Sequence, residues 1–216
     1  MTQNSKAQVF PLFPTPLYVT SYEGDTTEII KYFDSCEMNP GNEAYGAISK
    51  NTYVIEHPVC RPLSEFIMDC FKDYATNIMR YKYQDLQFAQ SWLTYKEKGQ
   101  AHKVHTHPNT LLSAVFYYDH EPGDSAICFS KVCTALGRSY LEPSLLEDFQ
   151  DYMYAQEQMY FYPVKNNLII FPSWLLHGVP PSNVDKVRKA LGVNALTKGT
   201  FGDQQTVSEI IFGRYA

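Results

Sequence analysis

The chain has 216 residues, of which 44% are hydrophobic and 19% are charged, and its formal net charge is −5. This length suits one folded domain with a substantial core, and the composition is too apolar for a disordered chain. The acidic chain has no long basic run, so we expect neither DNA nor RNA as a partner. No apolar stretch approaches the roughly 18 residues of a membrane span, and the N-terminus lacks the pattern of a signal peptide. We therefore expect a soluble, intracellular protein without a membrane partner.

The first third of the chain is predicted to be rich in helix. Val9–Val19 has the pattern of an opening strand, which its three prolines would restrict to the edge of a sheet. Asp25–Glu28 has the form of a helix cap and predicts a short helix after it. The strongest helix prediction is Pro62 to about Tyr81, where apolar residues repeat at three- and four-residue steps and line one face. Such a helix must pack against another element.

Beyond residue 85 the pattern changes to short β-strands. The high aromatic content of 15% favours β structure. The predicted strands are Leu86–Tyr95, Leu111–Tyr118, Ala126–Phe129, Met159–Tyr162, Leu168–Phe171 and Lys189–Leu196. Ser130–Gln158 is the least strand-like part and is interpreted as a long insertion, in which Pro143–Tyr154 is compatible with a short helix. We predict a mostly β fold with supporting helices, as a single domain over 1–216, with a helix-rich brace over about 1–85 and a β core over about 86–202.

Three of the six histidines gather within six positions, at His102, His105 and His107. In an extended segment, residues two apart point to the same side, so His105 and His107 would present both imidazoles to one point. On spacing alone, the alternative is two surface histidines on a polar face. His102 is interpreted as a loop residue, with a place at the edge of a pocket as the alternative. The His-x-His pair is therefore a candidate pair of metal ligands.

A third ligand would hold a divalent ion and still leave positions open for substrate or oxygen. His177 is the candidate, because it follows an apolar strand that runs into a proline-rich turn, where the sheet core meets solvent. By itself, a histidine in such a place is more often a core residue. Together with His105 and His107 it completes a candidate metal site.

Other residues stand at fixed distances from these histidines. Gly99 and Gln100 precede His105, with the glycine six residues before it, and Tyr95 precedes the glycine by four. Arg188 follows His177 by eleven residues. Six residues after this arginine comes Asn194. The segment Phe-Pro-Ser-Trp leads into His177, and the strand Ser113–Tyr118 follows the histidine pair.

Taken together, these motifs resemble the prolyl-hydroxylase-like branch of the 2-oxoglutarate and iron(II)-dependent oxygenases, close to small bacterial and phage members that carry His-x-His and a later histidine. In that family a Tyr-x-x-Gly-Gln stretch leads into the first histidine, so Tyr95 stands one residue further from Gly99 than the pattern asks. The likeness extends from about Val9 to Gly202. It implies a double-stranded β-helix, that is, a cupin-like jelly roll, in a bacterial cytoplasm, or in the host cytoplasm if the protein is phage-encoded.

The resemblance also implies a cofactor set of iron(II), the small-molecule co-substrate 2-oxoglutarate, and O2. In this reading His105, His107 and His177 bind the metal. Arg188 binds the far carboxylate of 2-oxoglutarate with its planar fork, which a lysine cannot reproduce. The remaining cofactor-binding candidates are Tyr117, for which Tyr118 is the alternative, and then Tyr95 and Asn194.

One residue departs from the family pattern. The usual Asp or Glu ligand, two residues after the first histidine, is His107 here. Either this imidazole replaces the carboxylate and gives a three-histidine site, or it turns away and water or another anion fills the position. Three neutral ligands compensate the charge of a ferrous ion less than a set with a carboxylate does, so metal affinity and redox behaviour should differ.

The resulting function prediction is a hydroxylase that couples decarboxylation of 2-oxoglutarate to hydroxylation of a C–H bond in a peptidyl, prolyl-like, or small-molecule substrate. One alternative is a metal-binding β-helix module without turnover, which the missing carboxylate ligand favours. Another is a three-histidine cupin-type dioxygenase that does not use 2-oxoglutarate. The presence of Arg188 at its spacing from His177 argues against this second alternative. Substrate choice is expected to depend on the loops around Asn42–Ser49 and Ser130–Gln158. The sequence carries no signal for an oligomeric state.

Overall fold

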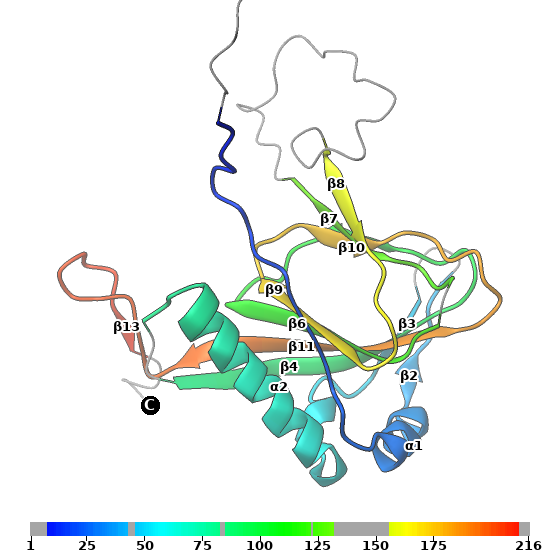
Figure 1. The fold of residues 1–216 in the computed structure, drawn as a ribbon. Helices are drawn as coiled ribbons and strands as arrows, with labels where there is room; N and C mark the ends of the chain where they lie inside the picture. The colour runs from blue at the N-terminus through cyan, green and yellow to red at the C-terminus, as the bar shows by residue number, and fades with distance from the viewer. Residues whose placement is uncertain (1–7, 43–45, 83–84, 122, 132–155, 212–216) are drawn as a thin grey trace, which may run out of the picture.

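The structure is a computed structural model that describes residues 8–42, 46–82, 85–121, 123–131 and 156–211. Two antiparallel sheets lie across from each other, and two helices cover the outer face of the larger sheet (Figure 1). In spatial order the larger sheet contains β1 (Tyr18–Ser21), β9 (Asn167–Pro172), β6 (Leu112–Asp119), β11 (Arg188–Lys198), β4 (Asp85–Lys96), β3 (Ala47–Ser49) and β2 (Met38–Asn39).

The smaller sheet carries two of the three candidate metal ligands. Its strands, in spatial order, are β5 (His102–His105), β10 (His177–Val179), β7 (Ile127–Ser130) and β8 (Gln158–Phe161). A separate two-stranded sheet of β12 (Thr200–Phe201) and β13 (Ile210–Ile211) follows β11. The predicted fold class, a mostly β jelly roll with supporting helices, is confirmed.

The helices close the outer face of the larger sheet. They are α1 (Thr27–Ser35) and α2 (Arg61–Asp73), with α2 continuing into a π-helical turn, Tyr74–Ile78; the short turns Val54–Glu56 and Pro58–Cys60 lead into α2. The apolar stripe of α2 packs on the outer face of the sheet, where Leu63, Ile67 and Phe71 are fully buried. This packing forms the main hydrophobic core. A second, smaller core lies on the opposite face of the sheet and contains Tyr117, Ile127, Ile169, Phe171 and Ala190.

Most predicted elements appear, and the differences have physical causes. The helix predicted at Pro62–Tyr81 is present as α2 and its π-helical turn. Within Val9–Val19 only the last two residues are in a strand, because the strand begins at Tyr18, after the prolines, which cannot donate a backbone hydrogen bond. The predicted loop Asn42–Ser49 contains β3, and Pro143–Tyr154 lies outside the described residues. None of the described helices is long and apolar enough to cross a membrane.

Candidate metal centre and co-substrate pocket

The pairing of β5 with β10 brings distant histidines together. His105, the last residue of β5, is the direct partner of His177, the first residue of β10. His107 lies beyond the end of β5, and its position is fixed by its backbone N–H, which donates to the Ser173 carbonyl oxygen at 3.0 Å. The side-chain nitrogens of the three histidines lie within 4.8 Å of one another, and the two Nε2 atoms of His105 and His107 are 3.1 Å apart.

Each imidazole of this three-histidine cluster has an oxygen beside its Nδ1 atom. The Nδ1 atom of His105 lies 2.8 Å from the Lys103 carbonyl oxygen, and that of His177 lies 2.9 Å from the Leu175 carbonyl oxygen. His107 Nδ1 lies 2.7 Å from Asn194 Oδ1. These oxygens can only accept, so the network assigns the proton to Nδ1 in all three rings. The Nε2 lone pairs are then free to coordinate a metal.

Burial favours the uncharged, coordinating form of two of the three imidazoles, His107 and His177. It lowers the pKa of His177 to about 3, and it also lowers the pKa of His107. A neutral imidazole is the form that binds a metal, and nitrogen donors suit divalent iron, zinc, copper and nickel. The residues present therefore fit a divalent transition-metal ion held by three protein nitrogens, with coordination positions left for other ligands.

Two cationic residues line the same pocket as the histidines. Arg188, the first residue of β11, and Lys96, the last residue of β4, both line the pocket, with only 1% and 3% of their surface exposed. The Arg188 guanidinium carbon lies 5.1 Å from the centre of the Tyr117 ring. Arg188 Nε and the Tyr117 hydroxyl, both buried, have no hydrogen-bond partner among the described residues. Burial raises the pKa of Tyr117 to about 12, so this hydroxyl is a donor at neutral pH. The two cationic side chains and the Tyr117 hydroxyl therefore suit a carboxylate ligand.

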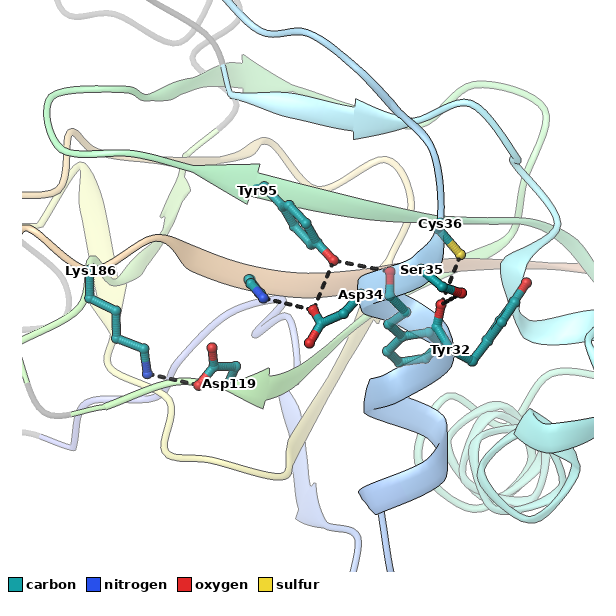
Figure 2. A network of polar contacts seen from close by, with 9 residues as sticks. Tyr32, Asp34, Ser35, Cys36, Tyr95, Asp119 and Lys186 are labelled. Carbon is teal, nitrogen blue, oxygen red and sulfur yellow. Dashed lines mark hydrogen bonds and ion pairs between the residues drawn. The ribbon is translucent and has the colours of Figure 1, made fainter.

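Two of the predicted cofactor-binding candidates lie on the other side of the larger sheet. Figure 2 shows Tyr95 reaching from β4 to the end of α1, where its hydroxyl donates to the Phe33 carbonyl oxygen at 3.1 Å and lies 3.3 Å from Asp34 Oδ1. Tyr118 packs its ring against Phe33 at a centroid distance of 5.0 Å. Tyr95 is therefore not at the pocket. Neighbouring residues of a strand face opposite sides of the sheet, so Tyr117 faces the pocket while Tyr118 faces α1.

Asn194 also has a different place from the one the resemblance implies. It is not among the residues that line the pocket, and its Oδ1 atom accepts from His107 Nδ1 and from the Ser113 hydroxyl, the latter at 2.8 Å. It therefore orients the third imidazole rather than contacting the pocket.

The pocket contains Lys96, which sequence reasoning did not single out, and His102, for which the alternative of a place at the edge of a pocket fits the structure better than a loop. Lys96 stands three residues before Gly99, where the family pattern Tyr-x-x-Gly-Gln has its tyrosine. Because Tyr95 lies one residue too early for this pattern, the sequence did contain a signal that Lys96 takes the place of the tyrosine. His102, interpreted as a loop residue, lies on β5 and stacks on His105 at a ring distance of 4.5 Å, facing the pocket. Trp92 also lines the pocket, whereas Trp174 is 53% exposed.

Residues 90–194 match the sequence model of a family described as putative 2OG-Fe(II) oxygenase. A search among curated proteins finds no match. The matched segment contains the three histidines, Arg188, Tyr117 and Lys96. This segment, just under half of the chain, is similar to the 2-oxoglutarate and iron(II)-dependent oxygenases, a family that uses iron(II), 2-oxoglutarate and O2, and the match agrees with the predicted class.

Solved structures support the same fold. A prolyl-4-hydroxylase from Pseudomonas putida is 14% identical, with a TM-score of 0.56 over 86% of this chain and 94% of that one. The non-haem alpha-ketoglutarate-dependent carbocyclase SnoK from nogalamycin biosynthesis is 16% identical, with a TM-score of 0.58 over 86% and 81%. HygX from Streptomyces hygroscopicus, solved with nickel and 2-oxoglutarate bound, is 12% identical, with a TM-score of 0.53 over 85% and 83%. At these identities the likeness shows the fold.

The cluster geometry predicts that His105→Ala and His177→Ala each abolish tight binding of iron(II), because two nitrogens and water must then hold the ion. The loss should exceed the roughly 10- to 100-fold typical of removing a group that only orients a metal ligand. Equilibrium dialysis against iron(II) without oxygen measures it. His57→Ala, which removes an exposed imidazole outside the cluster, is the control. Unchanged iron affinity in both cluster variants would contradict the metal assignment.

Proposed function

We propose that this oxygenase hydroxylates an unactivated C–H bond of a peptidyl, prolyl-like, or small-molecule substrate, and couples this step to oxidative decarboxylation of 2-oxoglutarate. In this proposal His105, His107 and His177 hold iron(II), while Arg188 and Tyr117 hold the distal carboxylate of 2-oxoglutarate. One observation carries the assignment: a single pocket is lined both by three imidazoles that can share a metal and by a buried arginine whose Nε atom has no hydrogen-bond partner among the described residues.

Each residue of the pocket has a role in this reaction. When bound, iron(II) supplies the redox chemistry by which O2 oxidises 2-oxoglutarate to succinate and CO2, while one oxygen atom enters the substrate C–H bond as a hydroxyl group. Arg188 offers two parallel N–H donors to the distal carboxylate, and Tyr117 offers a third donor. This contact would orient the 2-oxo end of the co-substrate toward the histidine cluster. Val115, Ile127 and Val179 add apolar walls that exclude water from the pocket.

Both substrate classes find support among the similar folds. The P. putida protein is a prolyl-4-hydroxylase, and SnoK is a carbocyclase from nogalamycin biosynthesis. Most of the residues that line the pocket of this chain lie on strands of the two sheets, and His107 lies just beyond the end of β5. Substrate choice then depends on the loops around the open side of the pocket, as is usual when a rigid scaffold carries a binding site.

The function test is coupled turnover. Protein supplied with iron(II), O2 and 2-oxoglutarate should release succinate, slowly without substrate and faster with a peptide or small molecule that is hydroxylated. Succinate is quantified by mass spectrometry, and a metal-free sample serves as the control. Iron binding without succinate would instead indicate a metal-binding module. Substrate oxidation that proceeds without 2-oxoglutarate would indicate a cupin-type three-histidine dioxygenase.

Arg188→Lys is expected to weaken 2-oxoglutarate binding but not iron binding, because a point charge cannot reproduce the two parallel donors. Losing two charge-assisted hydrogen bonds and regaining one costs on the order of 1.5–3 kcal/mol, or roughly 10- to 100-fold in Kd. Calorimetric titration of iron-loaded protein without oxygen measures both affinities. Arg61→Lys, at an exposed arginine on α2, is the matched control. Equal co-substrate affinity in wild type and Arg188→Lys would remove Arg188 from the site.

His107 is the ligand that departs from the family pattern. If it binds iron, His107→Asp restores the common set of two histidines and a carboxylate and retains the metal, whereas His107→Ala weakens iron binding and leaves the fold intact. Iron affinity by dialysis and thermal unfolding of the metal-free protein measure these outcomes. If His107→Ala binds iron as tightly as wild type, His107 is not a ligand, and water or another anion takes the position.

A further inference from the structure

Lys96 is a buried cation that the proposed function does not use. It is the Cα partner of Arg188 across the pairing of β4 with β11, so both side chains leave the sheet from neighbouring positions on the face that lines the pocket. Directly opposed residues of antiparallel strands have Cβ atoms about 5 Å apart. Two long cationic side chains that start this close together can reach one small ligand.

Among the residues that the structure describes, no carboxylate compensates this pair of charges. The pocket-lining residues include no Asp or Glu, and no ion pair of the described part of the chain involves Lys96 or Arg188. Burial first, and the Arg188 charge second, lower the pKa of Lys96 to about 7. An unpaired charge in a pocket that excludes water is costly. The pair therefore favours an anion supplied by a ligand.

We propose that Lys96 is a second cationic binding residue for the co-substrate, with its ammonium group donating to the same distal carboxylate that Arg188 binds. This inference rests on the proposed function. A carboxylate has two oxygens with about four acceptor sites, enough for the arginine fork, the Tyr117 hydroxyl and one lysine N–H. The family pattern has a tyrosine at this position, so this chain would replace a neutral donor by a charge.

The charge of Lys96 should change when the carboxylate arrives. The charged and titratable groups that line the described pocket together with Lys96 are Arg188, Tyr117 and the histidines His102, His105, His107 and His177. Of these, Arg188 on β11 helps to lower the pKa of Lys96, and the charge of Lys96 helps to lower the pKa of His102 on β5. In the free protein Lys96 is largely neutral above pH 7, since its pKa is about 7. A bound carboxylate favours the ammonium form and raises the pKa, so binding takes up a proton above pH 7. The affinity for 2-oxoglutarate should therefore fall as pH rises above 7.

The test compares two 2-oxo acids that differ only at the distal end. Iron(II)-loaded protein, kept free of oxygen, is titrated calorimetrically with 2-oxoglutarate and with 2-oxovalerate, which has a methyl group in place of the distal carboxylate. Lys96→Met keeps the length of the side chain and removes its charge. We expect it to weaken 2-oxoglutarate binding about 10- to 100-fold, the effect of one lost charge-assisted bond, and to leave 2-oxovalerate binding unchanged. Lys98→Met, at an exposed lysine paired with Asp185, is the matched control.

A second measurement uses the wild-type protein alone, so it does not depend on the folding of a variant. Titrations of 2-oxoglutarate at about pH 8 in buffers of different ionisation enthalpy should show proton uptake on binding. Uptake should be absent with 2-oxovalerate and, where the variant folds, in Lys96→Met.

Each outcome decides between the two proposals. Equal 2-oxoglutarate affinity in wild type and Lys96→Met, or no proton uptake by the wild type, would overturn the role of Lys96. A parallel loss of affinity for both 2-oxo acids would also overturn it, because Lys96 would then act at the metal end. If the iron-loaded wild type binds no 2-oxoglutarate at all, the proposed function itself fails.

Discussion

The pairing of β11 with both β4 and β6 is the constraint on which the site depends. Strand β11 pairs with β4 along its whole length and with β6 along most of it. Alternation then turns Arg188, Ala190, Gly192 and Asn194 toward the pocket and the residues between them toward the helices. At Gly192 a Cβ atom would lie 2.6 Å from the Trp92 ring, so any larger residue there would require this ring to shift. The central strand therefore sets the floor of the pocket and the positions of its polar groups.

The three imidazoles are oriented by hydrogen bonds to oxygens of neutral groups rather than to carboxylates. Backbone carbonyl oxygens engage the Nδ1 atoms of His105 and His177, and the Asn194 side chain, from the larger sheet, engages that of His107. The third candidate ligand is thus aligned by a residue of the opposite sheet. This contact couples the geometry of the candidate metal site to the distance between the two sheets. A shift of either sheet would turn His107 away from its neighbours.

The pocket combines two uncharged imidazoles with two cationic side chains. Burial holds the pKa values of His107 and His177 below their ordinary range, which favours their neutral form. Arg188 and the partly protonated Lys96 line the same pocket, and no carboxylate is among its described lining residues. A dianionic 2-oxo acid would supply negative charge both to the metal and to the two cationic side chains. Compared with the family pattern, His107 replaces a carboxylate and Lys96 replaces a neutral donor, so both changes make the pocket more positive.

The sequence by itself determined the class of fold, the helix over most of 62–81, the main strands and the histidine set, because these depend on local periodicity and on fixed spacing along the chain. It did not determine which face of the larger sheet each residue occupies. Tyr95 and Lys96 are neighbours, and only the register of β4 against β11 decides that the lysine faces the pocket and the tyrosine faces α1. The same holds for Asn194, whose contact with His107 joins two sheets. Side-chain direction in a strand reverses at every residue, so it is fixed by pairing between distant segments that no local pattern contains.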